Sequence, residues 1–333
     1  MINKKLKSTA ALIIILIVLN VTVMIASLAL GSVKLPLGDI ITGLFAANEN
    51  AGINAIVGSL RLPRMLGAAL AGVAFAVSGL LLQTVTDNRL CAPNIIGINS
   101  GAGFFVMLLL CISPSFWKFS SLAAFAGALL VAFSVMGIAG SLSRGKTETL
   151  ILAGIAVSSL FSAGISFLSI KYPDVLGNYA SFSVGGFSGV YIEELTLPAI
   201  TIVLFTALAA CLSKPLNSLC LGDSMARGLG TNVTLIRTLS VIAAAALSAA
   251  AVSFAGLIGF VGLIVPNLAR RIVGGDIRRL LPVSALLGAL ILTLSDLVGR
   301  IIIAPSEVPS GIIMSCLGVP FFIFLLLKRR GRQ

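Results

Sequence analysis

The sequence predicts an all-α integral membrane protein of ten transmembrane helices, with the N- and C-termini in the cytoplasm. Three observations support this prediction. Of the 333 residues, 58% are hydrophobic and only 10% are charged, whereas a soluble domain carries about 25% charged residues. Apolar runs of the ~20 residues needed to cross a bilayer recur along the whole chain. The basic residues, which give a net charge of +12, fall mainly on one side of the resulting topology.

Nine apolar runs have the length of a membrane span, and a shorter run lies between the seventh and the eighth. The long runs cover residues 9–31, 65–85, 95–113, 119–140, 149–170, 195–213, 234–255, 280–299 and 308–327. The first run is too long for a signal peptide and lacks a small-residue cleavage site, so we interpret it as an uncleaved span. No gap between runs is long enough for a soluble core, so residues 1–333 are expected to form one transmembrane domain.

The short apolar run at 256–269 decides the topology. If it crosses the membrane, 17 of the 23 Lys and Arg residues lie on the cytoplasmic side, and if it does not, only 10 do. The positive-inside rule therefore favours ten spans. Because a helix of 14 residues covers only about 21 Å, we expect a short helix joined to non-helical backbone that is buried within the protein.

The composition excludes several classes of function. The chain contains no His, which rules out Ser-His-Asp and Cys-His catalysis, His-ligated metals and His-based proton relays. We therefore expect neither an enzyme nor a resident metal or cofactor. Residues Gly140–Thr147 match the P-loop pattern, but no α/β domain can surround them, so we interpret them as a basic cytoplasmic turn. The positive charge marks membrane topology rather than a nucleic-acid partner.

Small residues in the spans predict a compact bundle. Gly72 and Ala76 recur at four-residue spacing in the second span, and alanines fill much of the seventh span. Such faces let helices approach closely, because packing drives helix association in lipid.

The longest cytoplasmic loop lies between the sixth and seventh spans. Gly222 breaks the chain there, Asp223 or Ser224 can cap a short helix, and Gly228 and Gly230 can end it. Within this loop, residues 214–233, the exposed apolar candidates are Leu216, Leu219, Leu221 and Leu229. Either these leucines lie back against the ends of the spans, or they form a docking helix for a cytoplasmic protein.

Three arginines, Arg61, Arg64 and Arg300, lie on the non-cytoplasmic side, against the prevailing bias. Either they anchor to lipid headgroups or cap helix ends, or they bind carboxylates of an extracytoplasmic partner, which suits guanidinium geometry. Asp296 precedes Arg300 by four residues in an apolar run, so we expect these two residues to pair. A proton-coupling role for Asp296 is the alternative, but one carboxylate without His makes a poor relay.

Five stretches of the chain, in order, carry a resemblance to a known family. They cover residues 61–103, 150–159, 216–233, 254–300 and 305–330 and begin RLPRMLG, LILAGIAV, LNSLCLGD, FAGLIGFVG and PSEVPSG. Over most of its length the chain thus resembles the permeases of iron-chelate and vitamin B12 ABC importers, the FecCD/BtuC-type family. Two positions depart from the family pattern, Arg89 in place of Pro and Asn267 in place of His, and both could tune the ATPase contact or the cytoplasmic mouth.

The resemblance implies a transport subunit of the bacterial cytoplasmic membrane that binds no ATP itself. Its implied partners are two ATPase subunits, an extracytoplasmic substrate-binding protein and a second permease subunit, identical or homologous, all organised around the lipid bilayer. Ferric siderophore, haem and cobalamin permeases share these motifs, so the substrate stays open among them. The alternatives are an ion-gradient-driven secondary transporter, which needs intramembrane carboxylates or broken helices in two repeats, and a metal-ion ABC permease.

The resemblance also implies roles for individual residues. The ATPase coupling loop would comprise Leu216, Leu219, Leu221, Gly222, Asp223, Ala226, Arg227, Gly228 and Gly230. Docking of the binding protein would use Arg61, Arg64 and Arg300, and the cytoplasmic gate would use Ser141, Leu142 and Ser143. The pathway would be lined by Ser158, Ser159, Ser162 and Ser166, for which ordinary interhelical hydrogen bonds are the alternative.

Overall fold

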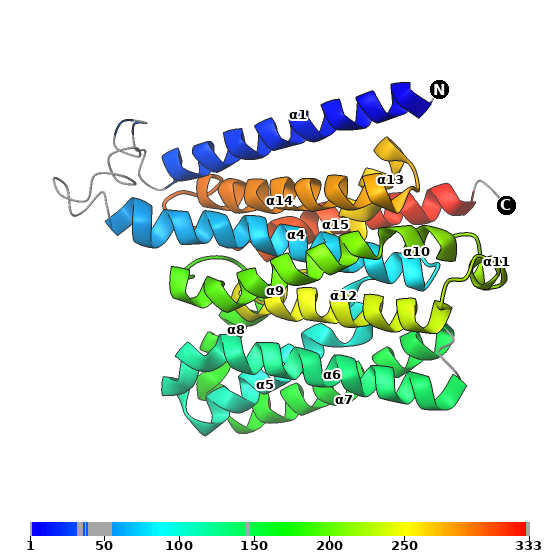
Figure 1. The fold of residues 1–333 in the computed structure, drawn as a ribbon. Helices are drawn as coiled ribbons and strands as arrows, with labels where there is room; N and C mark the ends of the chain where they lie inside the picture. Colours follow the sequence, from blue (N-terminus) through cyan, green and yellow to red (C-terminus); the bar gives the residue numbers. More distant parts are fainter. Residues whose placement is uncertain (1, 32–35, 37, 39–54, 144–146, 331–333) are drawn as a thin grey trace.

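The computed structural model describes residues 2–31, 36, 38, 55–143 and 147–330, and every regular element among them is a helix. The long helices are α1 (Ile2–Ala29), α4 (Leu62–Val85), α5 (Ile98–Ile112), α6 (Ser120–Ser143), α7 (Thr147–Lys171), α9 (Ile192–Cys211), α12 (Val233–Ala255), α13 (Val261–Val273), α14 (Ile277–Ile301) and α15 (Ser310–Arg330). The short ones are η1 (Ala55–Arg61), η2 (Pro93–Ile96), η3 (Pro114–Phe119), η4 (Pro173–Val175), α8 (Leu176–Val184), α10 (Ser213–Leu219) and α11 (Asp223–Gly228). The long helices lie side by side in one bundle (Figure 1).

One long helix coincides with each of the ten predicted spans, which confirms the predicted all-α class for the described residues. By length and composition, seven helices among these residues are able to cross a membrane, and α5 and part of α15 are shorter apolar helices. Crossing by all ten helices, with both termini in the cytoplasm, stays a prediction.

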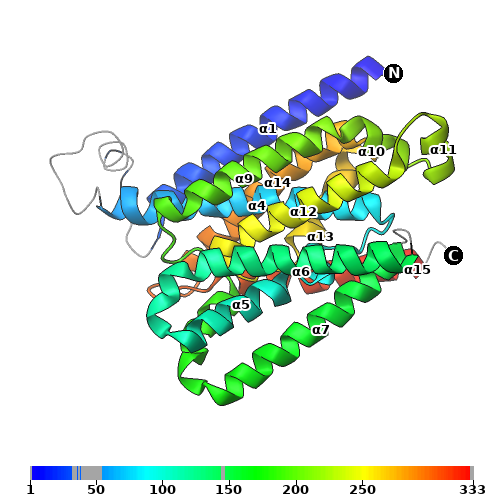
Figure 2. The ribbon, with the colours of Figure 1, turned by 60° about the horizontal axis from the view of Figure 1, so that its bottom comes forward.

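Close packing at the centre of the bundle follows from the predicted small residues. A Cβ atom added to Gly72 of α4 would lie 2.2 Å from the carbonyl oxygen of Gly288 in α14. A Cβ atom on Gly79 would lie 2.0 Å from the carbonyl oxygen of Gly262 in α13. These helices therefore touch backbone to backbone, as glycine faces permit. In contrast, α7 lies at one edge of the bundle and is largely uncovered (Figure 2).

The short eighth helix has the structure expected from its length. Residues 256–260 are non-helical and lead into α13, which is 13 residues long. Ile258 in this connection is only 3% exposed, so the non-helical backbone lies within the protein. Gly256 and Phe260 both have positive φ angles, 70° and 65°, and these turn the chain between α12 and α13.

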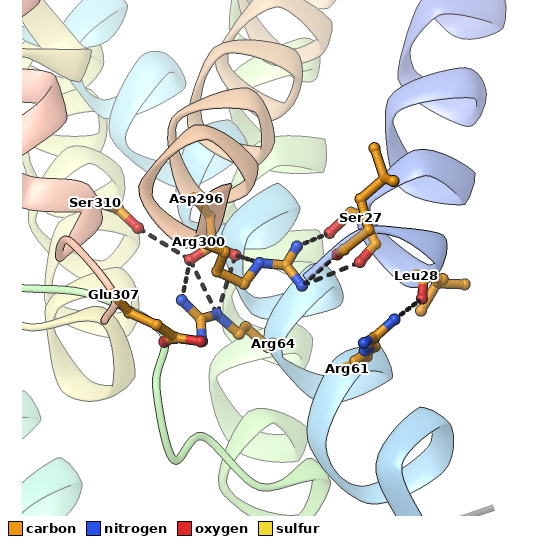
Figure 3. A network of polar contacts seen from close by, with 9 residues as sticks. Ser27, Leu28, Arg61, Arg64, Asp296, Arg300, Glu307 and Ser310 are labelled. Atoms are coloured by element: carbon orange, nitrogen blue, oxygen red, sulfur yellow. Dashed lines mark hydrogen bonds and ion pairs between the residues drawn. The ribbon is translucent and has the colours of Figure 1, made fainter. Parts of the chain in front are cut away.

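The two ends of the bundle differ in what they carry. Both termini lie at the same end as α10 and α11, which we call the termini end (Figure 1). At the opposite end, α1 and α14 finish and α4 begins, and the three arginines of the sequence prediction come together (Figure 3). We call it the arginine end.

Candidate functional site

At the termini end, two glycines set the position of α11. Gly222, between α10 and α11, has a φ of 96°, and Gly230, after α11, has a φ of 78°. Both values lie in the region that favours glycine. Gly222 also occupies the N-cap of α11 without a side-chain cap, so the expectation that Asp223 or Ser224 caps this helix is wrong.

The apolar residues of this loop divide into two groups. Leu216 and Ala226 are fully buried and Leu219 is 8% exposed, so these side chains hold the loop against the bundle. The apolar patch on the other side consists of Leu221, Met225 and Leu229, which are 60%, 63% and 66% exposed. Leu216 and Leu219 thus lie back against the bundle, as the first interpretation expects. Docking of a cytoplasmic protein on the exposed side chains stays a prediction, and no prediction from the sequence included Met225. Arg227, Gly228 and Gly230 are exposed beside the patch.

Polar contacts tie this loop to two long helices. The Arg237 guanidinium of α12 donates to both carboxylate oxygens of Asp223, at 3.0 and 2.9 Å. Asn217 of α10 donates to Asp276 at 2.7 Å, and it accepts the backbone N–H of Ile277 at 2.9 Å. A displacement of α10 and α11 would therefore act directly on the ends of α12 and α14.

At the arginine end, Asp296 is the centre of a buried ionic network (Figure 3). The Arg64 guanidinium of α4 donates from Nε and Nη2 to the Asp296 carboxylate at 3.0 Å. The expected pairing with Arg300 is confirmed, since Nε of Arg300 lies 3.2 Å from an Asp296 oxygen. The Ser310 hydroxyl of α15 donates to the same carboxylate at 3.1 Å. The Asp296 side chain is only 1% exposed, and partners within the protein surround its carboxylate.

The other two arginines fasten the end of α1 to this network. Arg300, 3% exposed, donates to the carbonyl oxygen of Ser27 at 3.0 Å and to the Ser27 hydroxyl. Arg61, 7% exposed, donates to the carbonyl oxygens of Leu28 and Ala29 at 2.5 and 3.1 Å. The last carbonyls of a helix lack partners within it, so these contacts match the helix-capping alternative.

Of the three arginines, Arg64 is the most exposed. Arg64 keeps 11% side-chain exposure, and its Nη1 donates to Glu307 at 2.6 Å, on the chain between α14 and α15. Together the two residues line a pocket of about 360 Å³. Its other lining residues include Glu194, Trp117, Phe182 and Phe187.

No prediction from the sequence included Ser27, Ser310 or Glu307 of this network. Glu307 carried a readable signal, because it is one of only 11 acidic residues in the chain and lies close after Arg300. The serines carried none, since serine is common in these spans.

The two departures from the family pattern touch each other. The Asn267 side chain of α13 donates to the backbone carbonyl of Arg89 at 2.9 Å and to that of Leu263 at 2.8 Å. Asn267 is 5% exposed, so this amide ties the connection between α4 and η2 to α13.

The predicted pathway residues lie on α7. Ser159, Ser162 and Ser166 are exposed and Ser158 is half-buried. The hydroxyls of Ser159 and Ser166 donate to the carbonyls of Ile155 and Ser162, one turn earlier in the same helix. These two hydrogen bonds therefore lie within α7 and do not join it to another helix. The predicted gate residues Ser141, Leu142 and Ser143 end α6, and their side chains lie outside the described residues.

Comparison with known proteins agrees with this architecture. The FecCD transport family matches residues 14–328. The Fe(3+)-citrate import system permease protein YfmE of Bacillus subtilis (strain 168) is 33% identical over 325 residues, 97% of each chain. The cobalamin import system permease protein BtuC of Halobacterium salinarum is 38% identical over 288 residues, 86% of this chain and 77% of that one. A solved structure, an inward-facing conformation of a metal-chelate type ABC transporter, has a TM-score of 0.83 at 30% identity and covers 96% of this chain and 99% of its own.

Proposed function

This chain belongs to the FecCD transport family, and on that premise we propose that it is the membrane-spanning permease subunit of a bacterial ABC importer. Its substrate class would be an iron chelate, a siderophore or haem complex, or a related corrinoid. The names of its relatives, an iron-citrate permease and a cobalamin permease, support this class. Energy would come from two separate ATPase subunits, and the chain itself would bind no nucleotide.

The apolar patch of Leu221, Met225 and Leu229 is the observation that carries the proposal. Each of these side chains is at least 60% exposed although the loop around them is anchored by buried residues. An ordered, exposed apolar cluster at the end of a membrane bundle needs a protein partner to cover it. We assign that partner as the ATPase, with α11 as the coupling helix and Gly222 and Asp223 setting its position.

Two helices would carry the ATPase motion across the protein. α12 is held to α11 by Asp223 and Arg237, and α14 begins at the Asn217 contact of α10. With 25 residues, α14 extends about 37 Å, and its last turns hold Asp296 and Arg300. Closure of the ATPase would thus shift the arginine end through α14 and switch access to the pathway.

The remaining partners would take the exposed faces. A substrate-binding protein would dock at the arginine end on Arg64, with Arg61 and Arg300 supporting that surface from within. A second permease subunit, identical or homologous, would face α7, which is the least covered of the apolar spans. The pathway would then run past Ser158, Ser159, Ser162 and Ser166, and Ser141, Leu142 and Ser143 would form its cytoplasmic gate.

The alternative, a secondary transporter, would need a titrating carboxylate within the membrane. Asp296 suits that role poorly, because two arginines neutralise it and its side chain is 1% exposed. The test is uptake into proteoliposomes that contain the permease, its ATPase and its binding protein. We expect uptake to require ATP and to survive ionophores that collapse all ion gradients. Uptake that proceeds without ATP and stops with the ionophore would contradict the proposal.

A further inference from the structure

The two edges of the Arg64 guanidinium are used differently. Its Nε and Nη2 are directed at Asp296, which is 1% exposed, is ion-paired with Arg300 and accepts a hydrogen bond from Ser310. No incoming group can reach that edge without dismantling the network. The Nη1 edge points instead to Glu307, which retains 35% side-chain exposure (Figure 3).

Among the contacts of this network that the described residues make, the Glu307 contact is the most exposed to solvent. Glu307 makes a single hydrogen bond of 2.6 Å to Arg64 and lies between α14 and α15, in a segment next to the exposed Ile302 and Ile303. Ion pairs of partly exposed groups contribute little to stability. Another carboxylate of similar geometry can therefore replace Glu307 at little energetic expense.

Charge balance shows what such a replacement requires. Arg64 and Arg300 carry two positive charges, and Asp296 and Glu307 carry two negative charges. While Glu307 is bound, Arg64 already has a carboxylate on each edge, so a further carboxylate meets a like charge at close range. The pocket beside Arg64 has a volume of about 360 Å³, which is enough for a side chain. Glu194 also lines this pocket, and its carboxylate adds to the repulsion of an incoming carboxylate.

We propose that Glu307 is an internal stand-in for a carboxylate of the substrate-binding protein, which must displace it from Nη1 of Arg64 when it docks in this pocket. Glu307 thereby weakens docking and lets the binding protein leave again. This inference rests on the proposed function. It adds that Glu307 opposes docking of the binding protein, whereas Arg64 favours it.

The test is the affinity of nanodisc-embedded permease for the binding protein that supports uptake through it, measured by biolayer interferometry at low salt. We expect Glu307→Gln to tighten binding about fivefold, the ratio that corresponds to one partly exposed ion pair. The matched control is Glu194→Gln, which removes the same charge from the same pocket without freeing Arg64. We expect it to change affinity less than twofold.

Several outcomes separate this inference from its alternatives. Unchanged or weaker binding by Glu307→Gln, or equal tightening by Glu194→Gln, would overturn it. If Glu307→Gln fails to fold, Glu307→Asp keeps the charge but shortens the reach, and it should tighten binding about twofold, whereas no change would count against the inference. If no binding protein supports uptake, the proposed function itself fails, and if one does but ignores Glu307, only this inference fails.

Discussion

The two ends of the bundle differ in which side chains they expose and which they bury: one exposes apolar side chains, and the other buries charged ones. At the termini end, apolar side chains of Leu221, Met225 and Leu229 face outward from a loop whose own anchors are buried. At the arginine end, Asp296 and Arg300 are buried and form an ion pair, and Arg300 and Arg61 donate to backbone carbonyls at the end of α1. The exposed patch is the part of the molecule that we propose a partner covers, whereas the buried charges hold helices of this chain together.

An Asp–Arg pair is therefore expected to contribute differently to stability at the two ends. Asp296 with Arg64 and Asp223 with Arg237 are both Asp–Arg pairs in which the guanidinium donates to both carboxylate oxygens. The first acid is 1% exposed and the second 39%. Burial, not geometry, sets the expected contribution of each pair to stability.

Asp296→Asn should produce the largest loss of stability. It leaves the Arg64 and Arg300 guanidiniums at the arginine end without their shared carboxylate, and breaking a buried pair costs about 3–5 kcal/mol. The matched change at the other end, Asp223→Asn, should cost about 0–1 kcal/mol. Thermal unfolding of both variants in detergent measures the difference. Equal destabilisation would show that burial does not distinguish the two ends.

Gly222→Val should abolish coupling while leaving the bundle folded. A β-branched residue at a φ of 96° is strained, so α11 should shift and carry the apolar patch with it. ATP hydrolysis by the assembled complex should no longer support uptake. In the same loop, Gly228→Ala is the control, because no heavy atom lies within 4 Å of an added Cβ atom. Retained uptake in Gly222→Val would contradict this role for the turn.

Asn232→Ala should have the smallest effect of these variants, a small loss of stability in thermal unfolding. The Asn232 side chain accepts the backbone N–H of Leu235 at 3.1 Å and so caps α12 beside the coupling loop. Loss of an N-cap costs about 1 kcal/mol, and Asn232→Asp should restore it. A loss of stability as large as that of Asp296→Asn would contradict the expectation that the exposed termini end contributes less to stability than the buried arginine end.

Local features of the sequence predicted the helices and the Asp296–Arg300 pair, but not the long-range contacts at the arginine end. The predicted span limits depend on apolar runs, and even the short eighth helix with its buried lead-in followed from charge counting. In contrast, the contacts of Arg64 with Asp296 and of Arg300 with Ser27 join residues 232 and 273 positions apart. No pattern within one span indicates such partners, so the sequence left helix capping and partner docking open as alternatives for the three arginines.

The coupling loop was predicted as one set of residues although the structure divides it in two. Leu216 and Leu221 are the same residue type in one short loop, yet they are 0% and 60% exposed. Their difference comes from the turn at Gly222 and from packing of α10 on the bundle. The break at Gly222 was readable from the sequence, but the packing of α10 on the bundle was not, because it depends on contacts with distant parts of the chain.

The central claim is that the apolar patch on α11 binds the ATPase. The most direct measurement is the affinity of purified ATPase for nanodisc-embedded permease in which Leu221, Met225 and Leu229 are replaced together by Ser. We predict binding at least tenfold weaker, on the order expected for loss of an interface hot spot, with unchanged thermal unfolding. The control replaces Ile302 and Ile303, which are 60% and 59% exposed at the opposite end, and should bind normally. Unchanged binding by the triple variant, or an equal loss in the control, would contradict the account.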